Sequence, residues 1–152
     1  MVTIEHASAG EVDEVAALFE AYRAFYHCVP DAPAARHFIS QRLANRDSAI
    51  LLAKDGGRAI GFVQLYPVFS SLKMKRAWIL NDLFVHPDYR GGGVARALME
   101  AARRLGGETR AASLSLETAH DNAPARALYE SLGYRVDGTY LHYELSLPDA
   151  TD

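Results

Sequence analysis

The sequence has little of what marks several classes of protein. Its 152 residues contain one cysteine, Cys28, so an internal disulfide and a cysteine-based zinc site are excluded. No apolar run approaches the ~20 residues of a membrane span. The first 15 residues show neither the basic nor the apolar region of a secretory signal. We therefore expect a cytosolic (cytoplasmic) protein with no membrane partner.

Basic charge and metal-binding patterns are also missing. The net charge is −3 and the isoelectric point is near 6.1, which gives no basic footprint for nucleic acid. The six histidines show no HExxH or paired-ligand spacing, so no metal is expected. An apolar fraction of 49% over this length fits one globular domain with its own core.

Periodicity and turn signals predict a mixed α/β chain. A capping-box pair, Ser8 and Glu11, opens the first helix, and Asp55-Gly56-Gly57 suits a hairpin turn. Pro67 suggests that its strand leaves the ladder there. Strands are predicted at residues 2–6, 49–53, 59–68, 76–85, 112–116, 134–136 and 140–147, and helices at 8–27, 34–45, 94–105 and 122–132.

The most informative stretch is residues 78–104. A mostly apolar strand leads through a turn into Arg90-Gly91-Gly92-Gly93 and then into an amphipathic helix. A helix N-terminus favours an anion, and glycines let the backbone approach a phosphate closely. Arg90 adds a planar fork of donors. The stretch predicts a cradle for a pyrophosphate.

Two familiar phosphate-binding motifs do not fit this stretch. A P-loop is excluded because no Gly-Lys-Ser/Thr follows at the required spacing. The dinucleotide pattern fails because Arg96 occupies its third glycine position. A tight turn with spare glycines is the remaining structural alternative.

A second motif lies at residues 121–134, where DNAPARALYESLGY reads as a capped helix carrying Tyr129. Together with Arg90-x-x-Gly93-x-Ala95 it strongly resembles the GCN5-related N-acetyltransferase (GNAT) superfamily. The resemblance covers most of residues 58–147. Within the superfamily, residues 61–85 are similar to the branch of small histone, polyamine and amino-acid acetyltransferases. The resemblance implies a single N-acetyltransferase domain at residues 1–147. It implies a mixed, mostly antiparallel twisted sheet with helices on both faces and a splayed parallel strand pair. Residues 148–152 are expected to form a frayed tail.

The resemblance also implies a site for acetyl-CoA as the acetyl donor. The pyrophosphate would lie on the cradle, pantetheine would pair with the backbone of residues 83–85, and the amide of Phe84 or Val85 would polarise the thioester carbonyl. The expected donor-binding residues are Leu83, Phe84, Val85, Arg90, Gly91, Gly92, Gly93, Val94, Ala95, Asn122 and Tyr129.

The implied catalytic residues are less evenly supported. Spacing alone makes Tyr129 a core tyrosine, but in the family the matching hydroxyl protonates the departing CoA thiolate. Asn122 is equally a helix cap. In several relatives a glutamate that can act as the general base occupies the position of Asn81. Asp82 and Glu117 therefore remain as candidate bases in this chain. A water chain to bulk solvent is the competing route.

These features predict an acetyl-CoA-dependent N-acetyltransferase acting directly on a primary amine in a ternary complex. The acceptor would be a small amine such as a polyamine or an amino acid, or a lysine side chain. A non-catalytic acyl-CoA-binding module is the alternative. Homodimerisation through residues 140–147 is a further expectation, because this branch commonly forms dimers through its C-terminal strands.

Overall fold

The computed structural model describes residues 1–149. The chain divides into two compact units, residues 1–117 and residues 118–152.

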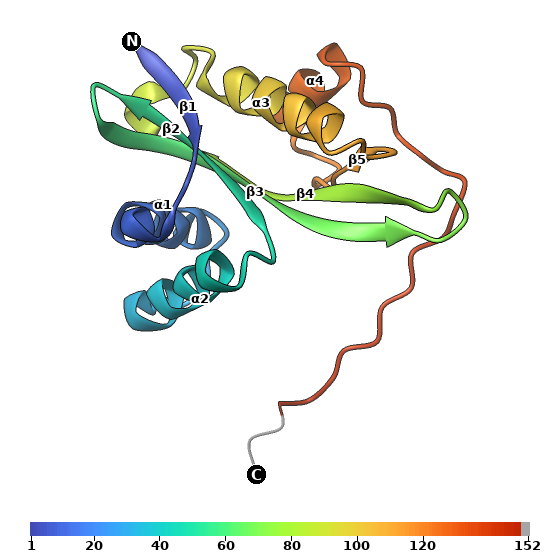
Figure 1. Cartoon of the computed structure of the whole chain (residues 1–152), viewed down its shortest axis with the longest axis horizontal. Helices are drawn as coiled ribbons and strands as arrows, with labels where there is room; N and C mark the ends of the chain where they lie inside the picture. The colour runs from blue at the N-terminus through green and yellow to red at the C-terminus, as the bar shows by residue number, and fades with distance from the viewer. Residues whose placement is uncertain (150–152) are drawn as a thin grey trace. The chain divides into compact units, whose positions relative to one another are not determined.

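The first unit is built on one five-stranded sheet in the order β1-β2-β3-β4-β5 (Figure 1). The first three pairings are antiparallel, and β4 with β5 is parallel. The β4–β5 ladder joins only Trp78 and Ile79 to Leu114 and Ser115. The strands are β1 (Val2–His6), β2 (Ala49–Asp55), β3 (Arg58–Ser70), β4 (Lys75–Val85) and β5 (Leu114–Ser115).

Helices cover both faces of this sheet. The pair α1 (Val12–Phe25) and α2 (Ala32–Asn45) lies on one face, and α3 (Val94–Glu108) lies on the other (Figure 1). Short 3-10 turns, η1 (Ala9–Glu11) and η2 (Pro87–Tyr89), precede α1 and the glycine-rich turn. The predicted architecture is confirmed: a mixed, mostly antiparallel sheet with a short parallel pair and helices on both faces.

Local chemistry explains where the first helices begin. Glu11 Oε1 accepts the backbone N–H of Ser8 at 3.0 Å, which completes the predicted capping box. The same glutamate pairs with Lys54 on β2 at 2.6 Å, so the start of the helical segment is tied to the sheet. Asp31 caps α2 by accepting from the backbone N–H of Ala34 at 3.1 Å.

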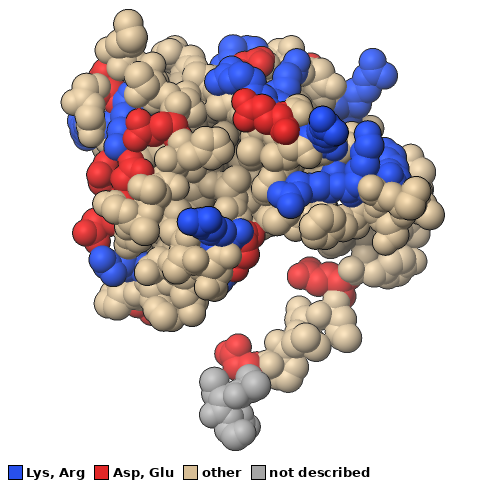
Figure 2. Space-filling view, in the orientation of Figure 1, with Lys and Arg blue, Asp and Glu red and all other residues tan. Residues whose placement is uncertain are grey.

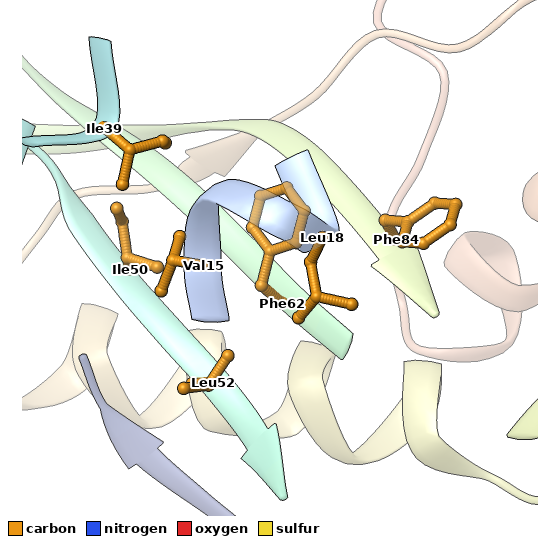
Figure 3. Packing of buried hydrophobic residues seen from close by; sticks show 7 residues of the cluster. All are labelled: Val15, Leu18, Ile39, Ile50, Leu52, Phe62 and Phe84. Carbon is orange, nitrogen blue, oxygen red and sulfur yellow. The ribbon is translucent and has the colours of Figure 1, made fainter. Parts of the chain in front are cut away.

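The main core lies between the sheet and the α1–α2 pair (Figure 3). Alternation along a strand sends every second side chain to this face, so Ile50 and Leu52 of β2 meet Phe62 of β3 and Phe84 of β4. The cluster of buried side chains comprises Val15, Leu18, Ile39, Ile50, Leu52, Phe62 and Phe84. Phe84 therefore fixes the end of β4 against α1.

One strand prediction was wrong at Pro67. The residue stays in the ladder opposite Trp78, and β3 continues to Ser70. The reason is that β2 pairs with β3 only as far as Leu65, so β3 is an edge strand at this point. A proline is tolerated on an edge strand, where a missing N–H need not cost a ladder bond.

The second unit contains one helix, α4 (Ala123–Ser131). Asn122 caps it by accepting from the backbone N–H of Ala125 at 3.3 Å, and Gly133 ends it with φ of +96°. The strands predicted at 134–136 and 140–147 are wrong: residues 134–149 form neither helix nor strand. A strand needs a paired neighbour, and in the described chain this segment has none. Residues 150–152 of the predicted frayed tail lie outside the described residues.

Candidate active site

The glycine-rich turn forms an open concavity at the start of α3. Gly91 and Gly93 have φ of +81° and +84°, values that L side chains rarely adopt, and Gly93 is the N-cap of the helix. A Cβ added at Gly91 or Gly93 would meet no atom within 4 Å, and one at Gly92 would meet only the Tyr89 carbonyl at 3.6 Å. The backbone amides of the turn therefore border open space at the positive end of a helix dipole.

Beside this turn, the edge of β4 that faces away from β3 is not paired with another strand of residues 1–117, and we call it the unshared edge of β4. The N–H of His86 donates to the Ile60 carbonyl at 2.7 Å, which makes that pair a hydrogen-bonded one in the antiparallel ladder. Alternation then turns the main-chain groups of Phe84 toward β3, whereas those of Leu83 and Val85 face the opposite side. Within residues 1–117, β5 pairs with β4 only as far as Ile79, so no strand of that unit covers this edge.

Arg90 joins the turn to the end of β4. Its Nε donates to the Val85 carbonyl at 3.0 Å. Its guanidinium lies 5.4 Å from the ring centroid of Phe84 and 5.5 Å from that of Phe25, the last residue of α1. The arginine is therefore held at the cradle by one hydrogen bond and two aromatic rings, and its planar fork carries further donors.

The two candidate carboxylates differ sharply in their surroundings. Asp82 is 4% exposed, with Oδ2 bonded to Gln64 and Oδ1 bonded to Asn81. Glu117 is exposed and lies beyond β5 in an irregular segment. Asn81 is the extra residue of a β-bulge, because Asp82 pairs with Gln64 while Leu80 pairs with Leu65. Only Asp82 is a buried carboxylate on β4, next to the unshared edge.

Aromatic side chains from α1 cover the same end of β4. Tyr22 packs against Phe62 and Phe84 at centroid distances of 5.9 and 6.5 Å, and its hydroxyl donates to the Asn81 carbonyl at 3.4 Å. Phe25 and Tyr26, at the helix end, are 54% and 56% exposed. The helix thus contributes a partly open aromatic wall beside the bulge.

The second unit holds the remaining predicted residues. Tyr129 is half-buried on α4, with its ring centroid 6.2 Å from that of Tyr134. Asn122 is the helix cap, which confirms the structural interpretation of that residue. The two residues lie in one short helical unit, as the motif predicts.

Comparison with known proteins decides the family. The model of the acetyltransferase (GNAT) family matches residues 15–134. The chain belongs to the GNAT family. The uncharacterized N-acetyltransferase YhfO of Bacillus subtilis (strain 168) is 44% identical over 147 residues, which is 97% of this chain and 99% of that protein. Family membership and such relatives make this chain an N-acetyltransferase, as predicted.

Solved structures agree with this assignment. A crystal structure of a probable acetyltransferase is 39% identical, superposes with a TM-score of 0.93, and matches over 97% of this chain and 99% of that one. A predicted acetyltransferase from Clostridium acetobutylicum, solved with acetyl-CoA, has a TM-score of 0.77 at 14% identity, covers 95% and 96% of the two chains, and supports the fold alone.

Sequence reasoning missed one buried residue of this acetyltransferase. Gln64 is fully buried on β3 and donates to Asp82 across the ladder at 2.6 Å. The signal was present, because Gln64 interrupts the apolar run Ile60-Gly61-Phe62-Val63 and Leu65 in a strand buried on both faces. A polar residue in such a run needs a partner.

The surface of the GNAT domain carries both signs of charge. On the face drawn in Figure 2, Lys and Arg side chains lie among Asp and Glu side chains. Within residues 1–149, no helix is long and apolar enough to cross a membrane. The same described part of the chain contains no group of three or more His, Cys, Asp or Glu placed to hold a metal ion.

Proposed function

We propose that this enzyme moves the acetyl group of acetyl-CoA directly to a primary amine in a ternary complex. The acceptor is a small amine such as a polyamine or an amino acid, or a lysine side chain. The observation that carries the proposal is the glycine-lined N-terminus of α3 next to the unshared edge of β4. An anion site and an extended backbone edge together match the two halves of acetyl-CoA, its pyrophosphate and its pantetheine arm.

The cradle binds the pyrophosphate. The backbone N–H groups of residues 91–95 supply donors that no side chain obstructs, and the helix dipole favours the negative charge. Arg90 adds charge from beside the cradle, using donors other than the Nε–H that it gives to Val85. The exposed glycines leave room for the phosphate oxygens to approach the main chain.

The edge of β4 receives pantetheine as an extra strand. Leu83 and Val85 point their main-chain groups to that edge, whereas those of Phe84 point to β3. Of the two amides expected to polarise the thioester carbonyl, we therefore assign the N–H of Val85. A fixed donor at that position stabilises the negative charge that develops on the carbonyl oxygen during attack.

Tyr129 serves as the general acid and Asn122 contacts the CoA arm while capping α4. A phenol with a reference pKa of ~10 can protonate a departing thiolate whose conjugate acid resembles a cysteine thiol at ~8.5. The thioester C–S bond breaks as the amine nitrogen bonds to the acetyl carbon, and the tyrosine proton goes to the leaving sulfur. The nitrogen releases a proton to solvent as the amide forms, and the phenolate regains a proton from solvent.

We assign Asp82 as the carboxylate that accepts a proton from the acceptor amine. An ammonium must lose a proton before it attacks, and Asp82 is buried, hydrogen-bonded on both oxygens and adjacent to Leu83. Glu117 is exposed in a segment outside the ladder, so it is held less firmly. Tyr22 and the exposed rings of Phe25 and Tyr26 would form the wall against which a cationic acceptor packs.

The test is thiol release from acetyl-CoA with and without spermidine, L-lysine or a lysine-containing peptide. We expect amine-dependent release with at least one of them, and a weaker affinity for acetyl-CoA in Gly93→Ala, because φ is +84° there. Gly107→Ala is the matched control. It lies in the last turn of the same helix, and a Cβ added there would meet no atom within 4 Å. Acetyl-CoA binding without release for any acceptor would favour the non-catalytic module.

We also propose that the chain acts as one domain over residues 1–147 and forms a homodimer through its C-terminal segment. The support for the dimer is a run of large apolar side chains at residues 136–147 that are at least 80% exposed: Val136, Tyr140, Leu141, Tyr143, Leu145 and Leu147. So much exposed apolar surface favours association. The cytosolic location stays a prediction.

A further inference from the structure

Two buried polar side chains face each other in the middle of the sheet. Among the described residues, Gln64 at 0% exposure and Asp82 at 4% are the polar or charged side chains that are buried. Burying a carboxylate costs free energy that a well-packed apolar pair would not cost. A pair retained at such a place needs an explanation other than packing.

Hydrogen bonds fix both side chains in one arrangement. Gln64 Nε2 donates to Asp82 Oδ2 at 2.6 Å, and the Ser48 hydroxyl donates to Gln64 Oε1 at 2.9 Å. Asn81 Nδ2 donates to the other carboxylate oxygen at 3.0 Å. Because an ionised carboxylate only accepts, these contacts also fix which way the Gln64 amide points. Each oxygen of Asp82 keeps capacity for a second donor.

The pair lies close to the point where the edge of β4 that faces away from β3 loses its partner strand, β5. Gln64 and Asp82 are directly opposite in register, Asn81 is the bulged residue before Asp82, and the next residue, Leu83, has its main-chain groups on the unshared edge. The Tyr22 hydroxyl holds the carbonyl of the bulge at 3.4 Å. Bulges next to active sites commonly redirect a side chain. Here the bulge sets the direction of Asp82.

Charged and titratable side chains around the pair include Tyr66, Arg42 and Tyr22. Burial raises the pKa of Tyr66 to about 12, with the negative charge of Asp82 as the next cause, so this phenol stays protonated at neutral pH. Arg42 at the end of α2 is paired with Asp47 at 2.9 Å. Tyr22, from α1, donates to a main-chain carbonyl.

We infer that Gln64 is a positioning residue for acetyl transfer, which holds the Asp82 carboxylate toward the acceptor amine and is itself oriented by Ser48. The inference rests on the proposed function, in which Asp82 accepts a proton from the amine. Gln64 contacts neither substrate. It acts by limiting the orientations of Asp82, so that the carboxylate is in place before the amine arrives.

A double-mutant cycle tests this role. Gln64→Leu, Asp82→Asn and the double variant are compared with the wild type by thiol release with whichever of spermidine, L-lysine or the lysine peptide is acetylated. We expect Gln64→Leu to lower kcat/KM for the amine about 10-fold to 100-fold with little change in KM for acetyl-CoA. In the Asp82→Asn background the same change should have almost no further effect. Additive losses would overturn the inference.

Milder variants keep the test valid if Gln64→Leu does not fold. Gln64→Glu keeps the shape but places two carboxyl groups together, so the acidic limb of the kcat/KM profile should move to higher pH. Gln41→Glu, at an exposed position of α2, is the control for added charge and should not move the profile. Ser48→Ala should lose activity that Ser48→Thr retains.

The outcomes separate this inference from the proposed function. If the wild-type enzyme acetylates none of the amines, the proposed function fails and the inference fails with it. If it does turn over, but Gln64→Glu keeps the wild-type pH profile and Ser48→Ala equals Ser48→Thr, only the inference is overturned. Thermal unfolding of each variant identifies losses caused by misfolding.

Discussion

Residues 1–117 and residues 118–149 are stabilised in different ways. The first unit holds all but one of the buried apolar side chains of the described chain, and a five-stranded sheet joins segments far apart in sequence. The second unit holds one buried apolar residue, Leu132, and a helix whose ends are set by its own cap and glycine. The ends of a short helix can be set by local capping residues, whereas a strand exists only with a partner.

The same difference separates two groups of the residues that we propose to act in acetyl transfer. The cradle, the β4 edge and Asp82 belong to the first unit, where long-range packing fixes them. Tyr129 and Asn122 belong to the second, on or at the start of a helix with a local cap. Variants in each unit test this division separately.

Tyr129→Phe asks whether the small unit takes part in the chemistry. If its hydroxyl protonates the leaving thiolate, turnover should fall by about 100-fold or more, whereas the affinity for acetyl-CoA should stay close to that of the wild type. Steady-state thiol release and calorimetric binding measure the two quantities. Tyr134→Phe, which changes the neighbouring ring on the same unit, is the control and should keep its turnover. Unchanged turnover in Tyr129→Phe removes the general-acid role.

Leu141→Asp combined with Leu145→Asp asks what the exposed C-terminal segment is for. Both side chains are more than 80% exposed, so the double variant should fold normally but lose the dimer, because charges oppose burial in a contact. Light scattering at two protein concentrations gives the mass. Leu72→Asp, at a 94% exposed position between β3 and β4, is the control and should leave the dimer intact. A wild-type monomer at both concentrations would contradict the dimer.

Gly61→Ala compares the packing of the two units directly. A Cβ at Gly61 would lie 2.9 Å from the Phe84 carbonyl oxygen and 3.4 Å from Leu98, so the backbone of β4 would have to move. We expect a loss of ~1–3 kcal/mol in the free energy of unfolding. Gly138→Ala, which meets no atom within 4 Å in the second unit, should change it by less than ~0.5 kcal/mol. Urea unfolding measures both, and equal values would contradict the contrast.

Glu11→Gln tests the ion pair that ties the first helix to the sheet. The hydrogen bond from Lys54 lowers the pKa of Glu11 below its ordinary 4.5, and the bond to Glu11 raises the pKa of Lys54 above 10.5. A carboxyl group whose pKa is lowered in the folded protein stabilises the fold at pH values above its unfolded pKa. An amine whose pKa is raised stabilises the fold at pH values below its unfolded pKa. The wild type should therefore exceed the variant in Tm by a few degrees between pH 4.5 and 10.5.

The difference should shrink as the pH falls further, because Glu11 then takes up a proton in the folded protein. Thermal unfolding followed by circular dichroism across this range provides the measurement. Glu14→Gln changes an exposed acidic residue in the first turn of α1 and should give curves that follow the wild type. A pH-independent difference for Glu11→Gln would rule out the charged pair as its cause.

The sequence predicted most of the first unit because its signals are local. Ser8 and Glu11 marked a helix start, alternation marked the strands, and the three glycines marked the turn before α3. It failed at residues 140–147, where an alternating pattern describes a strand that finds no neighbour in the described chain. Pairing is a property of the whole fold, and so the pattern alone could not decide it.

The candidate site follows the same rule. Arg90 and the glycines were predicted because their spacing is local, and Tyr129 because the family resemblance points to it. The direction of the Phe84 amide depends on the register of the β3–β4 ladder. The bond from Gln64 to Asp82 depends on that register and on the bulge at Asn81, and it joins residues 18 apart in sequence. The sequence of one strand alone does not determine its register with the other strand. Those features appear only when β3 and β4 are paired.

The donor half of the proposed site consists largely of main chain. Substitution changes side chains and leaves amide groups in place, so this half can drift in sequence as long as the turn keeps its shape. The acceptor half, with Asp82, Gln64 and the rings of α1, is made of side chains and changes with each substitution. One fold can therefore keep a common acetyl donor through evolution while it acquires new acceptors.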